Sequence, residues 1–341
     1  MSNIGVLGAG TWGMALARML YNSGHRVCVW SALKQEIEAF SATRRHPNLP
    51  GMEIPEGIAF TADMEQVCKQ RDILLFAVPS PFVRSTARLA APYIPDYQII
   101  VDVAKGIEAD TLLTMTGIIA QEIANPTVKL VALSGPTHAE EVAKDLPTTI
   151  VSACEDQSVA ELVQNVFWGT CMRVYTNDDV LGVELCGAVK NVIALAAGVA
   201  AGLGYGDNAK AALITRGMAE ISRLGIAMGC KEQTFGGLAG IGDLIVTATS
   251  VHSRNNRCGT LIGQGVPVDE AIKQTGMVVE GINALPAVIA LKEKYNVDMP
   301  IVEAAWQVVH QNIAPKDVVQ QLMGRGKKPE LPQSAWDNRY E

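Results

Sequence analysis

The feature that most constrains the fold is a set of three closely spaced glycines near the start of the chain. Gly8, Gly10 and Gly13 separate a short apolar run, Asn3–Gly8, from a helix-like stretch that begins at Thr11. G-x-G-x-x-G spacing between a strand and a helix is typical of a βαβ unit that binds the pyrophosphate of a dinucleotide. The spacing alone also fits an ordinary glycine-rich turn, so the neighbouring segments must decide.

Those segments favour the βαβ unit. Short β-branched runs alternate with helix-length segments through the first half of the chain. After the first run they are His25–Ser31, Asp72–Ser80, Gln98–Gly106, Lys129–Pro136, Thr148–Cys154 and Met172–Asp178. This alternation predicts a mostly parallel sheet with helices on both faces, an α/β domain of the Rossmann type. There Gly8 permits the tight turn, Gly10 lets the backbone approach a pyrophosphate, and Gly13 lets helix and strand pack closely.

The second half of the sequence has a different texture. From about Val180 long Ala-rich helical stretches replace the β-branched runs, so we expect an all-α second domain. The boundary is placed near Asp179, giving a dinucleotide-binding domain over residues 1–179 and a helical substrate-binding domain over residues 180–341. The polar tail after Met323 is expected to be a loose end.

Composition excludes several classes of protein. Hydrophobic residues make up 48% and charged residues 18%, which disfavours disorder. A net charge of −7 without a basic run disfavours nucleic acid as a partner. Seven scattered cysteines without a CxxC pair predict reduced thiols in the cytoplasm and no metal site. The N-terminus does not resemble a signal peptide, and the apolar run Val192–Gly204 is short for a bilayer, so we expect a buried helix and no stable membrane insertion.

The residues after the second predicted strand bear on the cofactor. An acid there holds the ribose 2′-hydroxyl of NAD, whereas a basic residue accommodates the 2′-phosphate of NADP. The chain has Ser31 and Ala32 at this point, and the nearest base is Lys34. The missing acid weakly favours NADP and the missing arginine weakly disfavours it. The preference is therefore left open, with a slight lean to NADP or to dual use.

Polar residues follow two of the predicted strands. Lys105 lies at the end of one, and Gly135 and Thr137 follow another. In an open α/β sheet this carboxyl edge is where ligands bind, so these residues are candidates for substrate contact. The alternatives are a solvated loop lysine at Lys105 and a simple helix cap at Thr137.

The most informative polar residues are Lys190 and Asn191, which interrupt an otherwise apolar helix. Lysine is almost never fully buried unless it is paired. One interpretation is a lysine that extends to the surface along the helix. The other is a general acid/base in a dry cleft between the domains, where burial and a neighbouring cation lower its pKa towards neutrality.

Three further stretches carry unusual polar residues. Asp243 lies in a Gly-rich turn, and Ser253, Arg254 and Asn255 open a helix. Ser, Arg and Asn at a helix start suit a phosphate or carboxylate, although an ordinary capped surface helix has the same pattern. Glu280 lies inside an apolar run, as a helix-start acid or as a polar contact to the cofactor.

Together these stretches resemble one family. "GAGTWGMALA", "AKGIE", "SGPTHAEEVA", "GVELCGAVKNVIALAAG", "GLAGIGDLIVT", "SRNNRCG" and "VVEGI" are similar, in order from about Gly5 to Met323, to the bacterial NAD(P)-dependent glycerol-3-phosphate dehydrogenases. The resemblance implies a C-terminal helical domain like that of 6-phosphogluconate dehydrogenase. It also implies interconversion of sn-glycerol 3-phosphate and dihydroxyacetone phosphate with NAD or NADP, supplying glycerol 3-phosphate for phospholipid synthesis.

The resemblance further implies roles for individual residues. Lys190 matches the family's proton acceptor and substrate ligand. The other positions that match substrate contacts are Lys105, Gly135, Thr137, Asp243, Ser253, Arg254 and Asn255. Those that match dinucleotide contacts, besides Gly8, Gly10 and Gly13, are Thr11, Trp12, Lys105, Ala139, Arg254, Val278 and Glu280, and Phe82 matches an aromatic near the nicotinamide in some relatives. Many relatives carry a basic pair or a histidine where this chain has Ser31 and Ala32, which puts strict NADPH preference in doubt.

Two rival functions fit parts of the same sequence pattern. One is another β-hydroxyacid-type dehydrogenase, such as a ketopantoate reductase or a 3-hydroxyacyl-CoA dehydrogenase, which "SRNNR" disfavours. The other is a non-catalytic dinucleotide sensor, which the intact set of Lys105, Lys190, Asp243 and Arg254 disfavours. The expected partners are a small phosphorylated triose and a second copy of the chain in a homodimer formed through Ala-rich helices. The sequence leaves open the physiological direction and feedback by lipid products.

Overall fold

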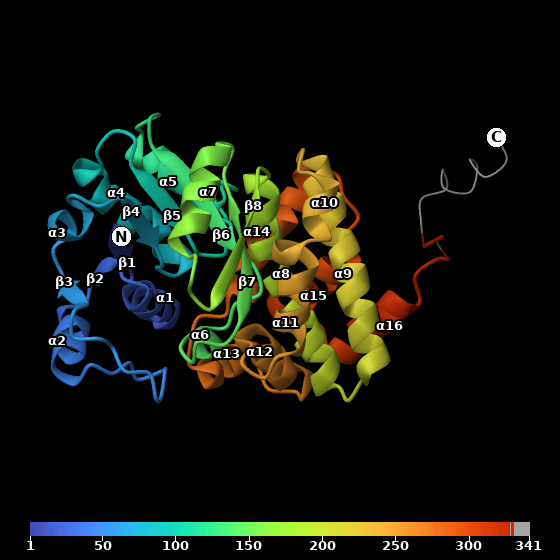
Figure 1. The fold of residues 1–341 in the computed structure, drawn as a ribbon. Coiled ribbons are helices and arrows are strands. Elements are labelled where there is room, and N and C mark those ends of the chain that lie inside the picture. The colour runs from blue at the N-terminus through green and yellow to red at the C-terminus, as the bar shows by residue number, and fades with distance from the viewer. Residues whose placement is uncertain (328, 331–341) are drawn as a thin grey trace.

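The computed structural model describes residues 1–327 and 329–330. A half that contains the β-sheet is formed by the first part of the chain, and a helical half by the later part lies beside it (Figure 1). The loose end predicted after Met323 falls largely on residues outside the described ones.

The sheet has eight strands in the order β3-β2-β1-β4-β5-β6-β7-β8. The strands are β1 (Asn3–Leu7), β2 (Arg26–Trp30), β3 (Ala59–Thr61), β4 (Ile73–Phe76), β5 (Ile99–Asp102), β6 (Lys129–Ser134), β7 (Thr148–Ala153) and β8 (Met172–Asn177). All neighbours pair in parallel except β6 and β7, which are antiparallel. The predicted Rossmann-type, mostly parallel sheet is confirmed, and the short strand β3 was not predicted.

Helices cover both faces of the sheet. Those of the first half are α1 (Thr11–Asn22), α2 (Lys34–Thr43), α3 (Met64–Cys68), α4 (Val83–Ala90), α5 (Met115–Ile123), α6 (Ala139–Val142) and α7 (Gln157–Val166). Alternate side chains of β4 show the two layers: Ile73 and Leu75 pack with α1 and α7, whereas Leu74 and Phe76 pack with α3, α4 and α5. This alternation follows from the two-residue period of a strand.

The carboxyl ends of β1, β4, β5 and β6 meet at one edge of the sheet because these strands are parallel. The segments that follow them, residues 8–13, 77–82, 103–107 and 135–138, therefore gather at this edge. The helical half adjoins the sheet through a small apolar cluster in which Val151 and Ala153 of β7 pack with Val183 and Ala239.

The helical half is built around one central helix. Its helices are α8 (Val180–Gly202), α9 (Asp207–Ala227), α10 (Glu232–Phe235), α11 (Asp243–Thr249), α12 (Arg254–Gly263), α13 (Val268–Thr275), α14 (Glu280–Lys294), α15 (Pro300–His310) and α16 (Pro315–Met323). Helix α8 packs against α9, α11, α12, α14 and α15. The predicted all-α second half is confirmed for the described residues.

Helix α8 is long and apolar enough to cross a membrane, and it is the one such straight helix in the described part of the chain. However, 83% of its most apolar window is buried inside the protein. It therefore forms the core of the helical half, as predicted for Val192–Gly204. Helix α8 begins at Val180, with Asp179 as its N-cap, and the division into domains at residues 179 and 180 stays a prediction.

Glycines bring α8 and α12 into close contact. A Cβ added to Gly198 of α8 would lie 2.2 Å from the carbonyl oxygen of Asn256, and one added to Gly259 of α12 would lie 2.1 Å from that of Leu195. Gly202 and Gly263, one turn further along each helix, face equally close backbone atoms. The two backbones touch where a side chain would separate them.

We expect Gly259→Ala to lower the free energy of unfolding by about 1–3 kcal/mol, because the methyl group forces the two helices apart. Urea denaturation followed by circular dichroism measures the change. The control is Gly236→Ala, whose added Cβ meets nothing closer than the Gln233 carbonyl at 3.8 Å. It should shift stability by no more than about 0.5 kcal/mol. Equal losses in the two variants would show that close helix packing is not the cause.

Candidate active site

The glycine turn after β1 has the geometry that a dinucleotide requires. Gly8 has a φ of +120°, and a Cβ there would lie 2.7 Å from the carbonyl group of Ala77. A Cβ on Gly13 would lie 2.2 Å from the oxygen of Gly8, so only glycine lets α1 sit this close to the strand. A Cβ on Gly10 would meet nothing within 4 Å, so this residue faces open space.

Helix α1 starts at this open space without a side-chain cap, because Gly10 is its N-cap residue. The N–H groups of the first turn, at Thr11 and Trp12, therefore lie where a pyrophosphate takes up hydrogen bonds and the positive end of the helix dipole. Helix α6, which begins at Ala139, packs beside α1. The residues present fit a dinucleotide.

Lys190 projects from the middle of α8 into the protein. Its side chain is 5% exposed, and Nζ donates to Asp243 Oδ1 at 2.5 Å and to Thr247 Oγ1 at 2.6 Å. The alternative of a lysine reaching the surface is therefore wrong. Asp243 is fully buried as the first residue of α11, directly after the glycine-rich turn in which it was predicted.

Lys105 reaches the same carboxylate from the sheet. Its Nζ donates to Asp243 Oδ2 at 2.7 Å, to the Gly135 carbonyl at 3.0 Å and to Thr137 Oγ1 at 3.2 Å. The alternative of a solvated loop lysine is thus wrong. Thr137 does not cap α6 either, because the N-cap residue is His138 and the Thr137 hydroxyl donates to the Gly135 carbonyl.

The surroundings of Lys190 set its protonation. Burial lowers the pKa of Lys190 from 10.5 to about 7; the Asp243 carboxylate opposes this and the Lys105 ammonium adds to it. When Lys190 has lost its proton, the group formed by Asp243, Lys105 and Lys190 carries no net charge. The amine is consequently able to exchange a proton at neutral pH.

A second polar group lies next to the first along α8. Asn255 Nδ2 donates to Asn191 Oδ1 at 2.9 Å, and Asn255 Oδ1 accepts from the backbone N–H of Gly281 at 2.8 Å. Ser253 is the N-cap of α12 and accepts from the Asn256 N–H. The helix start is therefore capped, as in the alternative interpretation, but Ser253 and Asn255 are both buried, so it does not lie at the surface.

Glu280 ties the two halves together. It is the first residue of α14, and its Oε2 accepts from the hydroxyl of Ser80, in the turn after β4, at 2.7 Å. Burial raises the pKa of Glu280, and the hydrogen bonds with Ser80 and the charge of Arg254 partly offset this. Phe82, 55% exposed, lies in the same turn as Ser80, and Val278 lies just before α14.

The sequence interpretation missed three residues of this region. Thr247 contacts the Lys190 amine from one helical turn beyond Asp243. Among the described residues, Ser134 Oγ and His138 Nε2 are buried atoms without a hydrogen-bond partner. Burial lowers the pKa of His138, and the Lys190 charge lowers it further. For Ser134 and His138, the polar run that begins at the end of β6 was the available signal.

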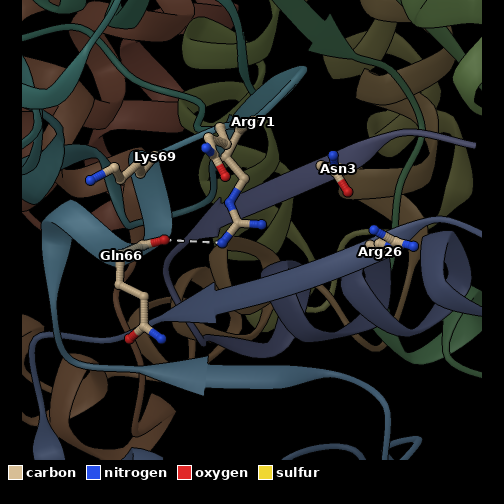
Figure 2. A pocket seen from close by; sticks show the side chains of 6 residues that line it. Asn3, Arg26, Gln66, Lys69 and Arg71 are labelled. Carbon is tan, nitrogen blue, oxygen red and sulfur yellow. Dashed lines mark hydrogen bonds between the residues drawn. The ribbon is translucent and has the colours of Figure 1, made fainter.

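A separate hollow lies at the opposite edge of the sheet, where β1 and β2 begin. Figure 2 shows Asn3, Arg26, Gln66, Lys69 and Arg71 around it. The Arg71 guanidinium donates to the backbone carbonyls of Gln66 and Val67, so it is already engaged. Within the described part of the chain no cluster of His, Cys, Asp or Glu could hold a metal ion.

Comparison with known proteins agrees with this geometry. The sequence pattern described as "NAD-dependent glycerol-3-phosphate dehydrogenase N-terminus" matches residues 3–160, and the corresponding C-terminus pattern matches residues 179–320. The chain belongs to the NAD-dependent glycerol-3-phosphate dehydrogenase family. The resemblance drawn from the sequence is thereby confirmed.

Similar proteins span nearly the whole chain. A glycerol-3-phosphate dehydrogenase [NAD(P)+] of Lactobacillus delbrueckii subsp. bulgaricus is 65% identical over 97% of this chain and 99% of its own. One from Bacillus velezensis is 46% identical over the full length of both. The crystal structure of the glycerol-3-phosphate dehydrogenase from Coxiella burnetii, 36% identical, superposes with a TM-score of 0.91 over 95% of this chain and 99% of that one.

A ketopantoate reductase from Ralstonia eutropha shares the fold alone, with a TM-score of 0.60 and 16% identity over 93% of this chain and 99% of its own. The fold therefore does not separate this family from that rival, and the family-specific sequence does.

The free protein tests the electrostatics of Lys190. We expect the Lys190 Cε resonance, in protein carrying 13C-labelled lysine, to titrate with a midpoint of about 7. Asp243→Asn should move the midpoint lower, since the carboxylate is what raises the pKa of Lys190 against burial. The signal is assigned by its loss in Lys190→Arg. The control is Asp207→Asn, at an exposed position on α9. A midpoint near 10.5 would contradict the burial argument.

Proposed function

We propose that this chain interconverts glycerol 3-phosphate and dihydroxyacetone phosphate with NAD or NADP. The observation that carries the proposal is the buried Lys190–Asp243–Lys105 group, which is assembled where the sheet edge meets the helical half. Membership of the glycerol-3-phosphate dehydrogenase family supports it. The dinucleotide, when bound, accepts or supplies the hydride, and the protein supplies alignment and charge.

Lys190 is the residue that moves the proton. In oxidation its neutral amine takes the proton of the C2 hydroxyl while the C2 hydrogen leaves as hydride, which converts the alcohol to a ketone. In reduction its ammonium polarises the ketone oxygen and then donates the proton. A pKa of about 7 makes both forms accessible near neutral pH.

Lys105, Asp243 and Thr137 position that chemistry. Asp243 holds the two amines on its two carboxylate oxygens, so their separation is set by one rigid group. Lys105, fixed by Gly135 and Thr137, orients the same substrate oxygen and lowers the pKa of Lys190.

The start of α12 is the proposed site for the substrate phosphate. Arg254 supplies the charge, and Ser253 and Asn255 fix the helix end. A guanidinium at a helix N-terminus is a strong anion site because charge-assisted hydrogen bonds and the helix dipole act together.

The dinucleotide site is proposed along the carboxyl edge of the sheet. Gly8, Gly10, Thr11, Trp12 and Gly13 hold the pyrophosphate. The nearby residues proposed to contact the remainder of the cofactor are Phe82, Lys105, Ala139, Arg254, Val278 and Glu280.

Family membership also supports a proposal for the cellular context of the enzyme. We place the enzyme in the cytoplasm, without stable membrane insertion, where its product supplies phospholipid synthesis. The burial of α8 supports this, because the most apolar helix of the described residues is already covered by other helices. A homodimer and a division into domains at residues 179 and 180 belong to the same proposal.

Removing the amine of Lys190 tests the mechanism. We expect Lys190→Met to lower kcat by about 10²–10⁴-fold while dinucleotide affinity changes little. Absorbance of the reduced nicotinamide measures turnover with dihydroxyacetone phosphate. Lys316→Met, at an exposed position on α16, is the control and should retain normal turnover. Near-normal turnover by Lys190→Met would remove Lys190 from this role. A wild-type protein that binds the cofactor but turns over no substrate would be a dinucleotide sensor. A wild-type protein that prefers ketopantoate as substrate would be a ketopantoate reductase.

The phosphate site is tested by Arg254→Ala. We expect the KM for dihydroxyacetone phosphate to rise about 10–100-fold, because a charge-assisted contact is lost. Arg257→Ala, three residues along α12 at an exposed position, should leave KM unchanged. An unchanged KM in Arg254→Ala would refute the phosphate assignment.

A further inference from the structure

An acidic side chain from the first turn of α2, that of Glu36, lies at the end of β2. Ser31, which follows β2, is 5% exposed, and its hydroxyl donates to Glu36 Oε2 at 2.6 Å. The same oxygen of Ser31 accepts from the Leu33 N–H at 3.1 Å. The hydroxyl has one hydrogen, which it donates in the hydrogen bond to Glu36. The carboxylate is thereby held at the carboxyl end of the strand.

Glu36 also lies beside the glycine turn. The N–H of Gly8 donates to the carbonyl of Trp30, which joins that turn to the end of β2. His46 is buried and hydrogen-bonds to the backbone of Ala9; burial lowers its pKa, and the Glu36 charge partly offsets this. Since His46 Nδ1 accepts from the Asn48 N–H, the nitrogen that faces Ala9 carries the proton.

This is the place where the adenosine ribose of a bound dinucleotide lies in a βαβ unit. The basic side chains nearby are either bonded to other groups or exposed to solvent. The Arg44 guanidinium donates to the carbonyls of Pro55 and Ile58 and lies over the Phe60 ring. Lys34 and Arg45 are exposed. The charged side chain that Ser31 holds at the end of β2 is therefore a carboxylate.

We propose that Glu36, fixed by Ser31, makes the site select NAD over NADP. Its carboxylate accepts a hydrogen bond from the free 2′-hydroxyl of NAD and repels the 2′-phosphate of NADP. This inference rests on the proposed function, because it places the dinucleotide on the glycine turn. The slight lean to NADP drawn from the sequence depended on the missing acid at Ser31 and Ala32, and Glu36 supplies one from the first turn of α2.

Binding measured without turnover tests the proposal. Titration of NADH and NADPH, followed by nicotinamide fluorescence, gives a dissociation constant for each. We expect wild-type protein to bind NADH at least about tenfold more tightly than NADPH, the range of one charged hydrogen bond. Glu36→Gln removes the charge and should narrow that ratio at least about fivefold.

The matched control is Glu38→Gln, the same change at an exposed position on α2, which should leave the ratio unchanged. Ser31→Ala keeps the carboxylate but frees it, so it should narrow the ratio less than Glu36→Gln does. It also gives a second measurement if Glu36→Gln folds poorly.

The possible outcomes separate the two proposals. Failure of both dinucleotides to bind would defeat the proposed function itself. Equal binding of NADH and NADPH by the wild-type protein, or a ratio that Glu36→Gln and Ser31→Ala leave unchanged, would overturn the role of Glu36 and leave the dehydrogenase proposal intact. A ratio that falls equally in Glu38→Gln would reduce the effect to general charge and also overturn it.

Discussion

A carboxylate with no exposure to solvent lies between two lysine amines, and both halves of the protein are needed to make that arrangement. Asp243 and Lys190 come from α11 and α8 of the helical half, whereas Lys105 comes from the edge of the sheet. A buried charge is costly unless it is paired. With Lys190 neutral, the Lys105 ammonium balances Asp243 and the group carries no net charge. With Lys190 protonated, the group carries one net positive charge in a buried place, so the pKa of Lys190 falls to about 7.

This balance makes the proton affinity of Lys190 sensitive to what lies beside it. A phosphorylated substrate brings negative charge and thus raises the pKa of the amine, whereas a cation next to the group lowers it. The effect also runs outward, since the Lys190 charge adds to burial in lowering the pKa of His138. A buried amine with one shared carboxylate can therefore hold its proton in one ligand state and release it in another, which a solvent-exposed lysine, with its pKa near 10.4, could not do near neutral pH.

How much the sequence could predict depends on the reach of each interaction. The sheet was predictable because β-branched runs alternate with helix-length segments, but β3 has three residues and too little pattern. The antiparallel pairing of β6 and β7 leaves no mark on either strand. Lys190 was identifiable because a lysine in an apolar helix is anomalous, and the roles of the site residues stay predictions. Thr247 looked like an ordinary helix residue, and Glu36 meets Ser31 because the turn through Leu33 brings the first turn of α2 next to the end of β2.

The close packing of the helical half also explains why its polar residues are ordered. Gly281 of α14 approaches α8 so closely that an added Cβ would lie 2.5 Å from the Asn191 carbonyl oxygen. That approach brings the Gly281 N–H onto Asn255, which in turn donates to the Asn191 side chain. Asn191 adjoins Lys190, and Asn255 adjoins Arg254. The glycine contacts of α8, α12 and α14 thus fix, through two amide side chains, the spacing between the proposed proton carrier and the proposed phosphate anchor.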